Sequence, residues 1–248
     1  MSIQKKLWGV ASQKGPRPTM EDAYFFFETP QGWIAGLFDG HVGGEGSAEA
    51  ARLFALKLSS GQQHPPTREY LTDLFRQVNQ ELAGKIGGTT ALVVIRHHDQ
   101  LTCAVAGDSQ CVMLALGGEL VINEPHRLTH EIERDRVAQA GGTIVLLSGT
   151  YRVLRNDGTR GLMVTRALNN PQYAPGVIPD PEVIHFTNEL SARFICLVCD
   201  GVWEFVSPEK MNTLAKRKRS PRVLAEWLVS VALTQGSMDN CTALVVRL

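Results

Sequence analysis

Two apolar runs of this chain each end in an aspartate that is followed by glycine, and this pattern constrains the fold most. Residues 33–38 lead into Asp39, and residues 193–199 lead into Asp200. Both runs are typical of buried strands, where an ionised acid is costly unless a cation or an arginine neutralises it. A lone Asp-Gly is more often a tight turn. The recurrence argues against chance, so we expect a cation or an arginine beside Asp39.

Glycines follow the first acid closely. Gly40 has no side chain, so its carbonyl can approach a ligand, and Gly43 and Gly44 interrupt the strand before a helical pattern over residues 46–59. The segment is therefore expected to be an exposed strand-to-helix junction, where functional sites are commonly built.

The length and charge of the chain exclude several classes of protein. Its 248 residues are 44% hydrophobic, and no Pro/Ser-rich linker divides them, so we expect a single domain over residues 1–248. Lys plus Arg equals Asp plus Glu at 25 each, so no global field favours nucleic acid or acidic membranes. The N-terminus has no apolar signal segment, and no run of about 18 apolar residues occurs. We expect a soluble, intracellular and cytoplasmic protein.

The cysteines do not form a disulfide or zinc pattern. Five is an odd and sparse number, and all of them sit in apolar runs, which predicts reduced core residues. Cys196 and Cys199 form a lone CxxC. Three positions apart on a strand, their side chains point to opposite faces, which argues against a shared zinc ion.

The order of elements predicts antiparallel sheets flanked by amphipathic helices. Strands are expected over residues 101–106, 111–116 and 119–122, with Gly117-Gly118 as a two-residue hairpin turn. A polar helix is expected over residues 130–140, and residues 148–161 are interpreted as loop. Other helices are expected to begin at Thr67, Ser207-Pro208 and Ser220-Pro221, the first with an apolar face of Leu71, Leu74, Phe75, Val78 and Leu82.

A basic run, residues 216–219, lies between the last two predicted helices. We interpret it as a solvated loop, with a nuclear address or an anionic contact as the less favoured alternative.

Six acids lie beside predicted strands: Glu21, Asp22, Asp39, Asp108, Asp200 and Asp239. If they converge, repulsion would force several of them to be protonated unless divalent cations take up the charge. Oxygen ligands favour Mg²⁺ or Mn²⁺ over zinc. Two such ions about 4 Å apart can share and activate a water for attack on phosphorus.

The chain resembles the metal-dependent protein phosphatases of the protein phosphatase 2C (PPM) family. The matching motifs follow the family's order from residue 17 to residue 240. They are Arg17-x-x-Met20-Glu21-Asp22, Phe38-Asp39-Gly40-His41-x-Gly43, Gly88-Thr89-Thr90-Ala91, Ala106-Gly107-Asp108-Ser109, Ala140-Gly141-Gly142, Thr165-Arg166-Ala167-Leu168, Cys199-Asp200-Gly201-Val202-Trp203 and Asp239-Asn240.

The resemblance implies a fold and an activity. The fold would be α+β, a four-layer α-β-β-α sandwich of two antiparallel sheets flanked by helices. The activity would be Mg²⁺- or Mn²⁺-dependent hydrolysis of phosphoserine and phosphothreonine in phosphoprotein substrates, by a water that bridges two ions. We expect a monomer.

The resemblance also implies the ligands of the two ions. Asp39 would bridge them, Asp200 and Asp239 would complete one coordination shell, and the Gly40 carbonyl with Glu21 would serve the other.

Four further positions take roles from the same resemblance. Asp22 would hydrogen-bond metal-bound water, and Arg17 would hold the phosphate with its planar fork. His41 would be the general acid, with an ordinary loop histidine as the alternative. Asp108 would serve a weaker third ion.

The sequence departs from the family pattern at three places. Gln110 replaces an arginine, Asn169-Asn170 replaces Gly-Asp, and the Asp-His-Lys-Pro expected after Leu128-Thr129 is missing. These departures bear on substrate choice and on the third ion more than on the two-ion core.

Two alternatives come from other classes. A pseudophosphatase would bind partners without turnover, but it would have no need for unpaired buried carboxylates. A metallophosphatase with histidine ligands would require clustered histidines, whereas those of this chain lie alone or in predicted turns.

Overall fold

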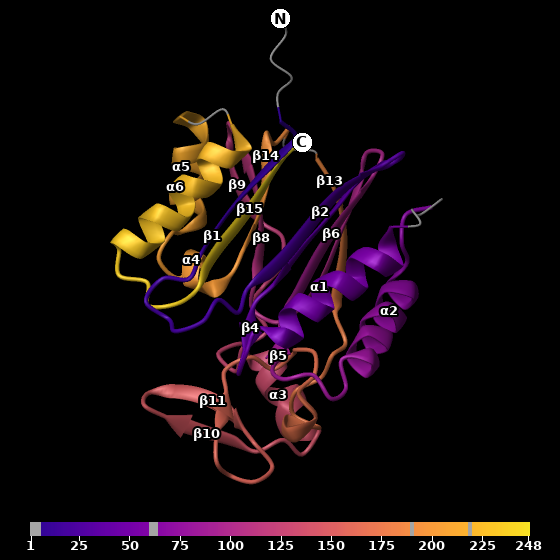
Figure 1. Ribbon diagram of the computed structural model, residues 1–248, viewed down its shortest axis with the longest axis vertical. Helices are drawn as coiled ribbons and strands as arrows, with labels where there is room; N and C mark the ends of the chain where they lie inside the picture. Colours follow the sequence, from indigo (N-terminus) through magenta and orange to yellow (C-terminus); the bar gives the residue numbers. More distant parts are fainter. Residues whose placement is uncertain (1–5, 60–63, 189–190, 218–219) are drawn as a thin grey trace, which may run out of the picture.

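The computed structural model describes residues 6–59, 64–188, 191–217 and 220–248. Two antiparallel sheets lie face to face, and helices cover the outer face of each sheet (Figure 1). The predicted α+β four-layer sandwich is therefore confirmed.

One five-stranded sheet carries the first apolar run as an inner strand, next to the edge strand. Its strand order is β13-β7-β6-β3-β2, and every neighbouring pair is antiparallel. The strands are β2 (Ala23–Thr29), β3 (Gly32–Phe38), β6 (Ala91–His97), β7 (Gln100–Ala106) and β13 (Glu182–Thr187).

The other five-stranded sheet carries the second apolar run. Its order is β1-β15-β14-β8-β9, again with antiparallel neighbours throughout. The strands are β1 (Trp8–Gln13), β8 (Gln110–Ala115), β9 (Gly118–Val121), β14 (Phe194–Val198) and β15 (Cys241–Arg247).

Strand β3 is apolar along its whole length because both of its faces are buried. Trp33, Ala35 and Leu37 point into the core between the two sheets. Ile34 and Phe38 alternate with them and point to the helices outside the sheet. A strand in the middle layers of a four-layer fold has no solvent face, so its sequence shows no polar alternation.

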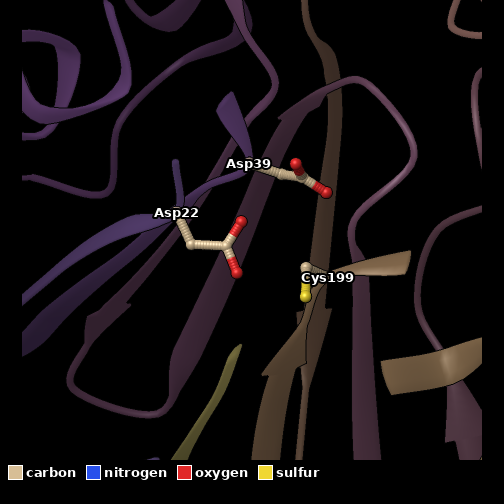
Figure 2. A group of neighbouring side chains, drawn as sticks. All are labelled: Asp22, Asp39 and Cys199. Carbon is tan, nitrogen blue, oxygen red and sulfur yellow. The ribbon is translucent and has the colours of Figure 1, made fainter. Parts of the chain in front are cut away.

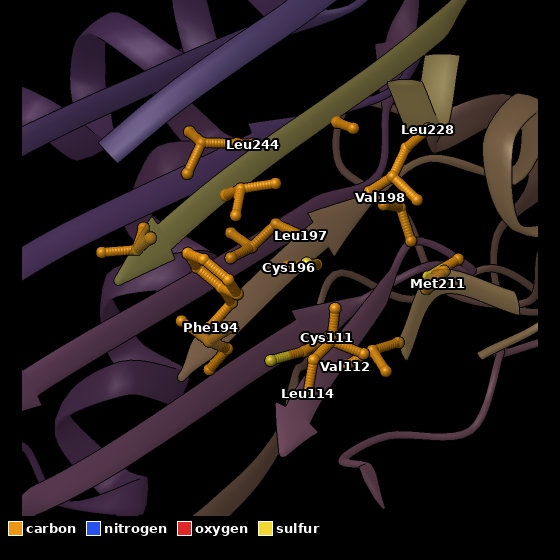
Figure 3. Close-up of a cluster of buried hydrophobic side chains, with 14 of the residues drawn as sticks. Cys111, Val112, Leu114, Phe194, Cys196, Leu197, Val198, Met211, Leu228 and Leu244 are labelled. Carbon is orange, nitrogen blue, oxygen red and sulfur yellow. The ribbon is translucent and has the colours of Figure 1, made fainter. Parts of the chain in front are cut away.

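The core between the sheets continues under the helices of the second sheet. Figure 3 shows part of it, with Leu197 of β14 beside Leu244 of β15, its partner in the sheet. Met211 and Leu228 reach the same cluster from the helices α5 (Pro208–Arg217) and α6 (Pro221–Thr234). The prolines at the starts of both helices agree with the predicted start signals.

Two helices cover the first sheet. They are α1 (Glu45–Leu58) and α2 (Arg68–Glu81), and the predicted apolar face of α2 is buried. The Thr67 hydroxyl caps α2 by accepting a hydrogen bond from the backbone N–H of Tyr70 at 3.2 Å.

A smaller layer lies beyond one end of the sandwich, at the bottom of Figure 1. It contains α3 (Glu131–Gln139) and a three-stranded sheet of β10 (Ile144–Leu147), β11 (Thr150–Leu154) and β12 (Gly161–Leu162). The interpretation of residues 148–161 as loop was therefore wrong, because β11 and β12 fall within it. Partly exposed short strands have too little apolar patterning to be read from sequence.

Two other expectations need correction. The turn between β8 and β9 is Leu116-Gly117, one position earlier than predicted, because Ala115 pairs with Gly118. Strand β13 was not predicted, since the half-buried Glu182 and the exposed His185 conceal the alternation.

The remaining predictions concern the cysteines, the basic run and membrane-spanning segments. All five cysteines are free and buried, as expected. Lys216 and Arg217 of the basic run end α5, whereas residues 218–219 lie outside the described residues. None of the helices in the described part of the chain has the length and apolar character needed to cross a bilayer.

Glu133 ties α3 to the neighbouring loop through two arginines. Its carboxylate is 2.5 Å from Arg166 Nη2 and 3.0 Å from Arg136 Nη2, and it accepts a hydrogen bond from Thr165 Oγ1 at 2.6 Å. Burial alone would raise the pKa of Glu133. The hydrogen bonds and charges of Arg166, Thr165 and Arg136 outweigh burial and lower this pKa to about 2.

We predict that Glu133→Gln lowers the free energy of unfolding by roughly 2–3 kcal/mol at pH 7. The native pKa is below the unfolded value, so the ionised carboxylate stabilises the fold above about pH 4.5, and this contribution is lost as the pH falls towards 2. Urea unfolding at several pH values should show the difference from wild type shrinking over that window. Glu131→Gln on the same helix, where the side chain is 80% exposed, should leave stability unchanged at every pH.

Candidate metal centre

Antiparallel pairing brings the predicted acids of the first sheet to one end of the sandwich. Ala23 at the start of β2 pairs with Phe38 at the end of β3. Glu21 and Asp22, which precede β2, therefore lie beside Asp39, which follows β3. Residues 17 positions apart meet because one strand begins where its neighbour ends.

The same geometry operates in the second sheet. Ala243 in β15 pairs with Val198 at the end of β14, so Asp239 lies near Asp200. Asp108 follows β7 and completes the group. The sequence-predicted acids thus converge at one end of the two sheets.

A cavity of about 350 Å³ opens at this end. The predicted site residues Arg17, Glu21, Asp39, Gly40, His41, Asp108, Asp200 and Asp239 all line it. Asp22 is not part of the lining. Figure 2 shows the Asp22 carboxylate beneath Asp39 and close to the thiol of Cys199.

Asp39 belongs to two groups of potential metal ligands. Carboxylate oxygens of Asp39, Asp108 and Asp200 lie within 4.8 Å of one another. Ligand atoms of Asp22, Asp39 and Cys199 also lie within 4.8 Å of one another. Asp39 is therefore the residue that the two groups share.

Crowding and burial raise the pKa values of these acids. Burial, followed by the charges of Asp200 and other neighbouring acids, raises the pKa of Asp39 well above its usual range. Burial and the charge of Asp108 raise the pKa of Asp200 to about 8, although Arg127 acts in the opposite direction. Burial raises the pKa of Asp22 to about 6 despite the hydrogen bond that Thr242 donates. Divalent cations would relieve this strain.

The donor set fits a hard divalent cation. Asp22 Oδ1 is buried without a hydrogen-bond partner, so the site has an unsatisfied anionic oxygen. The Cys199 thiol donates to the Asn240 carbonyl at 3.4 Å, and burial raises its pKa well above the usual range. The Cys199 thiol is thus committed to a hydrogen bond, and the carboxylate oxygens are the candidate ligands. Oxygen ligation favours Mg²⁺ or Mn²⁺ over zinc.

A glycine is needed at position 40 because a larger side chain would not fit there, and also because its carbonyl must be accessible to a ligand. A Cβ at this position would lie 2.3 Å from the Glu21 carbonyl oxygen. The Glu21 carboxylate accepts hydrogen bonds from the Gly43 N–H and from Thr19 Oγ1, both at 3.0 Å. The glycine-rich junction thus holds Glu21 at the cavity wall.

His41 lies on the cavity wall and is oriented by Asn170. Asn170 Nδ2 donates to the Leu168 carbonyl at 2.7 Å, so Asn170 Oδ1 faces His41 Nε2 at 2.8 Å. Because Oδ1 can only accept, His41 Nε2 carries a proton in this arrangement. Burial lowers the pKa of His41. Asn170, one of the noted departures, is thus a neutral partner of the predicted general acid.

Arg17 sits at the cavity mouth. Its Nη2 lies 2.6 Å from Asp239 Oδ2, and its Nε donates to the Met238 carbonyl at 3.2 Å. The side chain is 53% exposed, so the guanidinium can reach an anion that enters from solvent.

Three residues with structural roles in the site were missed. Asn240 fixes the Arg17 loop by donating to the Lys14 and Thr19 carbonyls at 2.8 and 3.0 Å. Thr242 donates to Asp22 at 2.6 Å. Arg127 pairs with Asp108 and Asp200. The place of Asn240 beside Asp239 was a usable signal, whereas nothing in the sequence placed Arg127 near the acids.

The sandwich and the acidic cavity at its end together define the class of metal-dependent phosphatases, and the comparisons specify the family. The sequence model of "Protein phosphatase 2C" matches residues 29–241, and the chain belongs to this family. Membership supports protein phosphatase activity and metal binding.

Relatives from Arabidopsis thaliana are similar over most of this chain. Probable protein phosphatase 2C 69 is 33% identical, with 97% of this chain and 69% of the relative covered. Probable protein phosphatase 2C 71 is also 33% identical, with 97% of this chain and 55% of the relative covered. The chain thus spans between half and about two thirds of the lengths of these two curated relatives.

Solved structures share the fold. A Caenorhabditis elegans sex determining protein matches with a TM-score of 0.85 and 22% identity over 97% of this chain and 64% of that one. A serine-threonine phosphatase 2C from Toxoplasma gondii matches with a TM-score of 0.82 and 20% identity, covering 97% and 94% of the two chains.

We predict that Asp39→Asn stabilises the metal-free protein while abolishing its stabilisation by Mn²⁺. The raised pKa of Asp39 means that its carboxyl destabilises the fold above the unfolded pKa near 4, and increasingly so up to neutral pH. Thermal unfolding with a chelator should give a higher Tm for the variant at pH 7.5 and little difference near pH 4. With added Mn²⁺ the order should reverse at pH 7.5, and a variant that still gains stability from Mn²⁺ would contradict the assignment.

Proposed function

We propose that this chain is a protein serine/threonine phosphatase that hydrolyses phosphoserine and phosphothreonine with two Mg²⁺ or Mn²⁺ ions. The observation that carries the proposal is the convergence of Glu21, Asp39, Asp200 and Asp239 in a cavity that also contains Arg17. Family membership supports the phosphatase class. The ion identity, ion number and residue specificity belong to the proposal.

The acids would hold the ions as follows. Asp39 would bridge both, with Asp200 and Asp239 on one side and the Gly40 carbonyl and Glu21 on the other. When bound, the ions would activate a shared water for attack on phosphorus, so that hydrolysis needs no covalent enzyme intermediate. Asp22 lies beneath Asp39 and would orient water through its unsatisfied oxygen.

Arg17 would orient the phosphate. Its guanidinium has planar N–H donors that match two phosphate oxygens, which a lysine could not do. Its position at the cavity mouth suits a phosphoryl group presented on a flexible protein segment. We propose phosphoproteins as substrates and a monomer as the working form.

His41 would protonate the departing serine or threonine oxygen. Because Asn170 accepts from Nε2–H, the proton for the leaving oxygen would come from Nδ1–H of the protonated ring, and the lowered pKa makes that ring a stronger acid than an exposed histidine. The alkoxide of serine is a poor leaving group, so a proton donor is useful for that substrate.

A peptide panel tests the proposal. We expect Mn²⁺-dependent release of phosphate from phosphoserine and phosphothreonine peptides, little release from phosphotyrosine peptides, and no release by Asp39→Asn. A malachite-green assay with and without chelator measures this. No turnover of any phosphopeptide with Mn²⁺ or Mg²⁺ would refute catalysis and favour a partner-binding role.

The general-acid role makes a separate prediction about leaving groups. His41→Ala should lower kcat about 10²–10⁴-fold for a phosphoserine peptide. It should lower kcat much less for p-nitrophenyl phosphate, because that leaving group needs no proton. His130→Ala is the matched control, since His130 is 40% exposed and does not line the cavity. Equal losses on both substrates would show that His41 is not the proton donor.

A further inference from the structure

Arg127 contacts three carboxylates, two of which line the acidic cavity. Its Nε lies 2.6 Å from Asp108 Oδ2, its Nη2 lies 2.8 Å from Asp200 Oδ2, and its Nη1 pairs with Glu204. Each of the three nitrogens of the guanidinium thus contacts a different acid.

The guanidinium is held in place from other directions as well. The side chain of Arg127 is only 14% exposed, and its Cζ lies 4.9 Å from the centre of the Trp203 ring. Trp203 Nε1 donates to the Asp108 carbonyl at 2.9 Å. Trp203 therefore contacts both Arg127 and the backbone of Asp108.

Arg127 approaches these acids from behind. Asp108 and Asp200 line the cavity, but Arg127 does not. Three of its five N–H donors already face carboxylates, one at each nitrogen, so the guanidinium has no unoccupied pair of nitrogens to offer a phosphate. This arrangement is that of a positioning residue rather than of a substrate-binding residue.

An ion shared by Asp108, Asp200 and Glu204 would compete with Arg127 for these carboxylates. An arginine keeps its charge at every accessible pH, so it would repel a divalent cation in the same space. The resemblance to the family suggested a weaker third ion at Asp108. The contacts of Arg127 argue against one in this chain.

We propose that Arg127 supplies the positive charge at the Asp108–Asp200–Glu204 cluster in place of a third divalent ion and thereby positions Asp200 for a two-ion centre. The inference rests on the proposed two-ion function, which can fail separately from it.

Counting bound ions tests the proposal without reference to activity. Wild type is dialysed against Mn²⁺ from micromolar to millimolar concentration, and bound Mn²⁺ is measured by mass spectrometry. We expect two ions per chain for wild type, three for Arg127→Met, and two for Arg127→Met combined with Asp108→Asn. Arg127→Lys, which keeps the charge, should also bind two.

The control is Arg136→Met, which removes another partly buried arginine that pairs with a buried acid. It should bind two ions, whereas a general loosening of the structure would change its count as well. Three ions in wild type, or two in a folded Arg127→Met, would overturn the role of Arg127. No Mn²⁺ bound to wild type would instead refute the proposed metal-dependent function.

A measurement on single-site variants covers the case in which Arg127→Met does not fold. Asp108→Asn in the otherwise native chain should leave the count at two. A fall from three ions to two in that variant would locate a third ion at Asp108 and overturn the proposal.

Discussion

Repulsion among carboxylates is the constraint on which this structure depends. Oxygens of Asp39, Asp108 and Asp200 lie within 4.8 Å of one another in a recessed cavity, and the pKa values of Asp39 and Asp200 are raised. Such a cluster weakens the fold by itself. It persists because the surrounding sandwich is rigid, with both faces of β3 packed into cores. Arg127 offsets part of this loss of stability by pairing with Asp108 and Asp200, and divalent cations bound to the acids would offset more of it.

Antiparallel strand pairing in the sandwich brings residues that are distant in the sequence close together in space. Acids that follow β3 and β14 meet acids that precede β2 and β15, since antiparallel neighbours begin where their partners end. The two sheets then bring the two sets of acids together. Shifting one strand by a single residue would turn its buried side chains to the opposite face, so the core that stabilises the sheets also fixes the site.

The sequence was most informative where apolar runs stop at an acid. Those runs predicted β3 and β14, and the recurring Asp-Gly pairs identified Asp39 and Asp200. Hairpin signals located β8 and β9 but misplaced their turn by one residue, because either Leu116-Gly117 or Gly117-Gly118 can form a turn. Strand β11 was missed because its partly exposed residues lack a clear alternation.

Arg127 could not have been predicted, because its importance depends on contacts with residues 19 to 77 positions away. An arginine in a polar segment looks like any solvated charge until the fold is known.

The two arginines of the site differ in how strongly their partners hold them in place. Arg17 is 53% exposed, and its one carboxylate partner, Asp239, is itself a proposed metal ligand, so an ion that binds Asp239 would compete with Arg17 for it. Arg127 is 14% exposed and has three carboxylate partners and an aromatic ring, so displacing it would leave several buried charges unpaired. The cost of moving a charged side chain rises with its burial and with the number of its partners. Arg17 is therefore suited to exchange its partner for a phosphate, whereas Arg127 is suited to remain where it is.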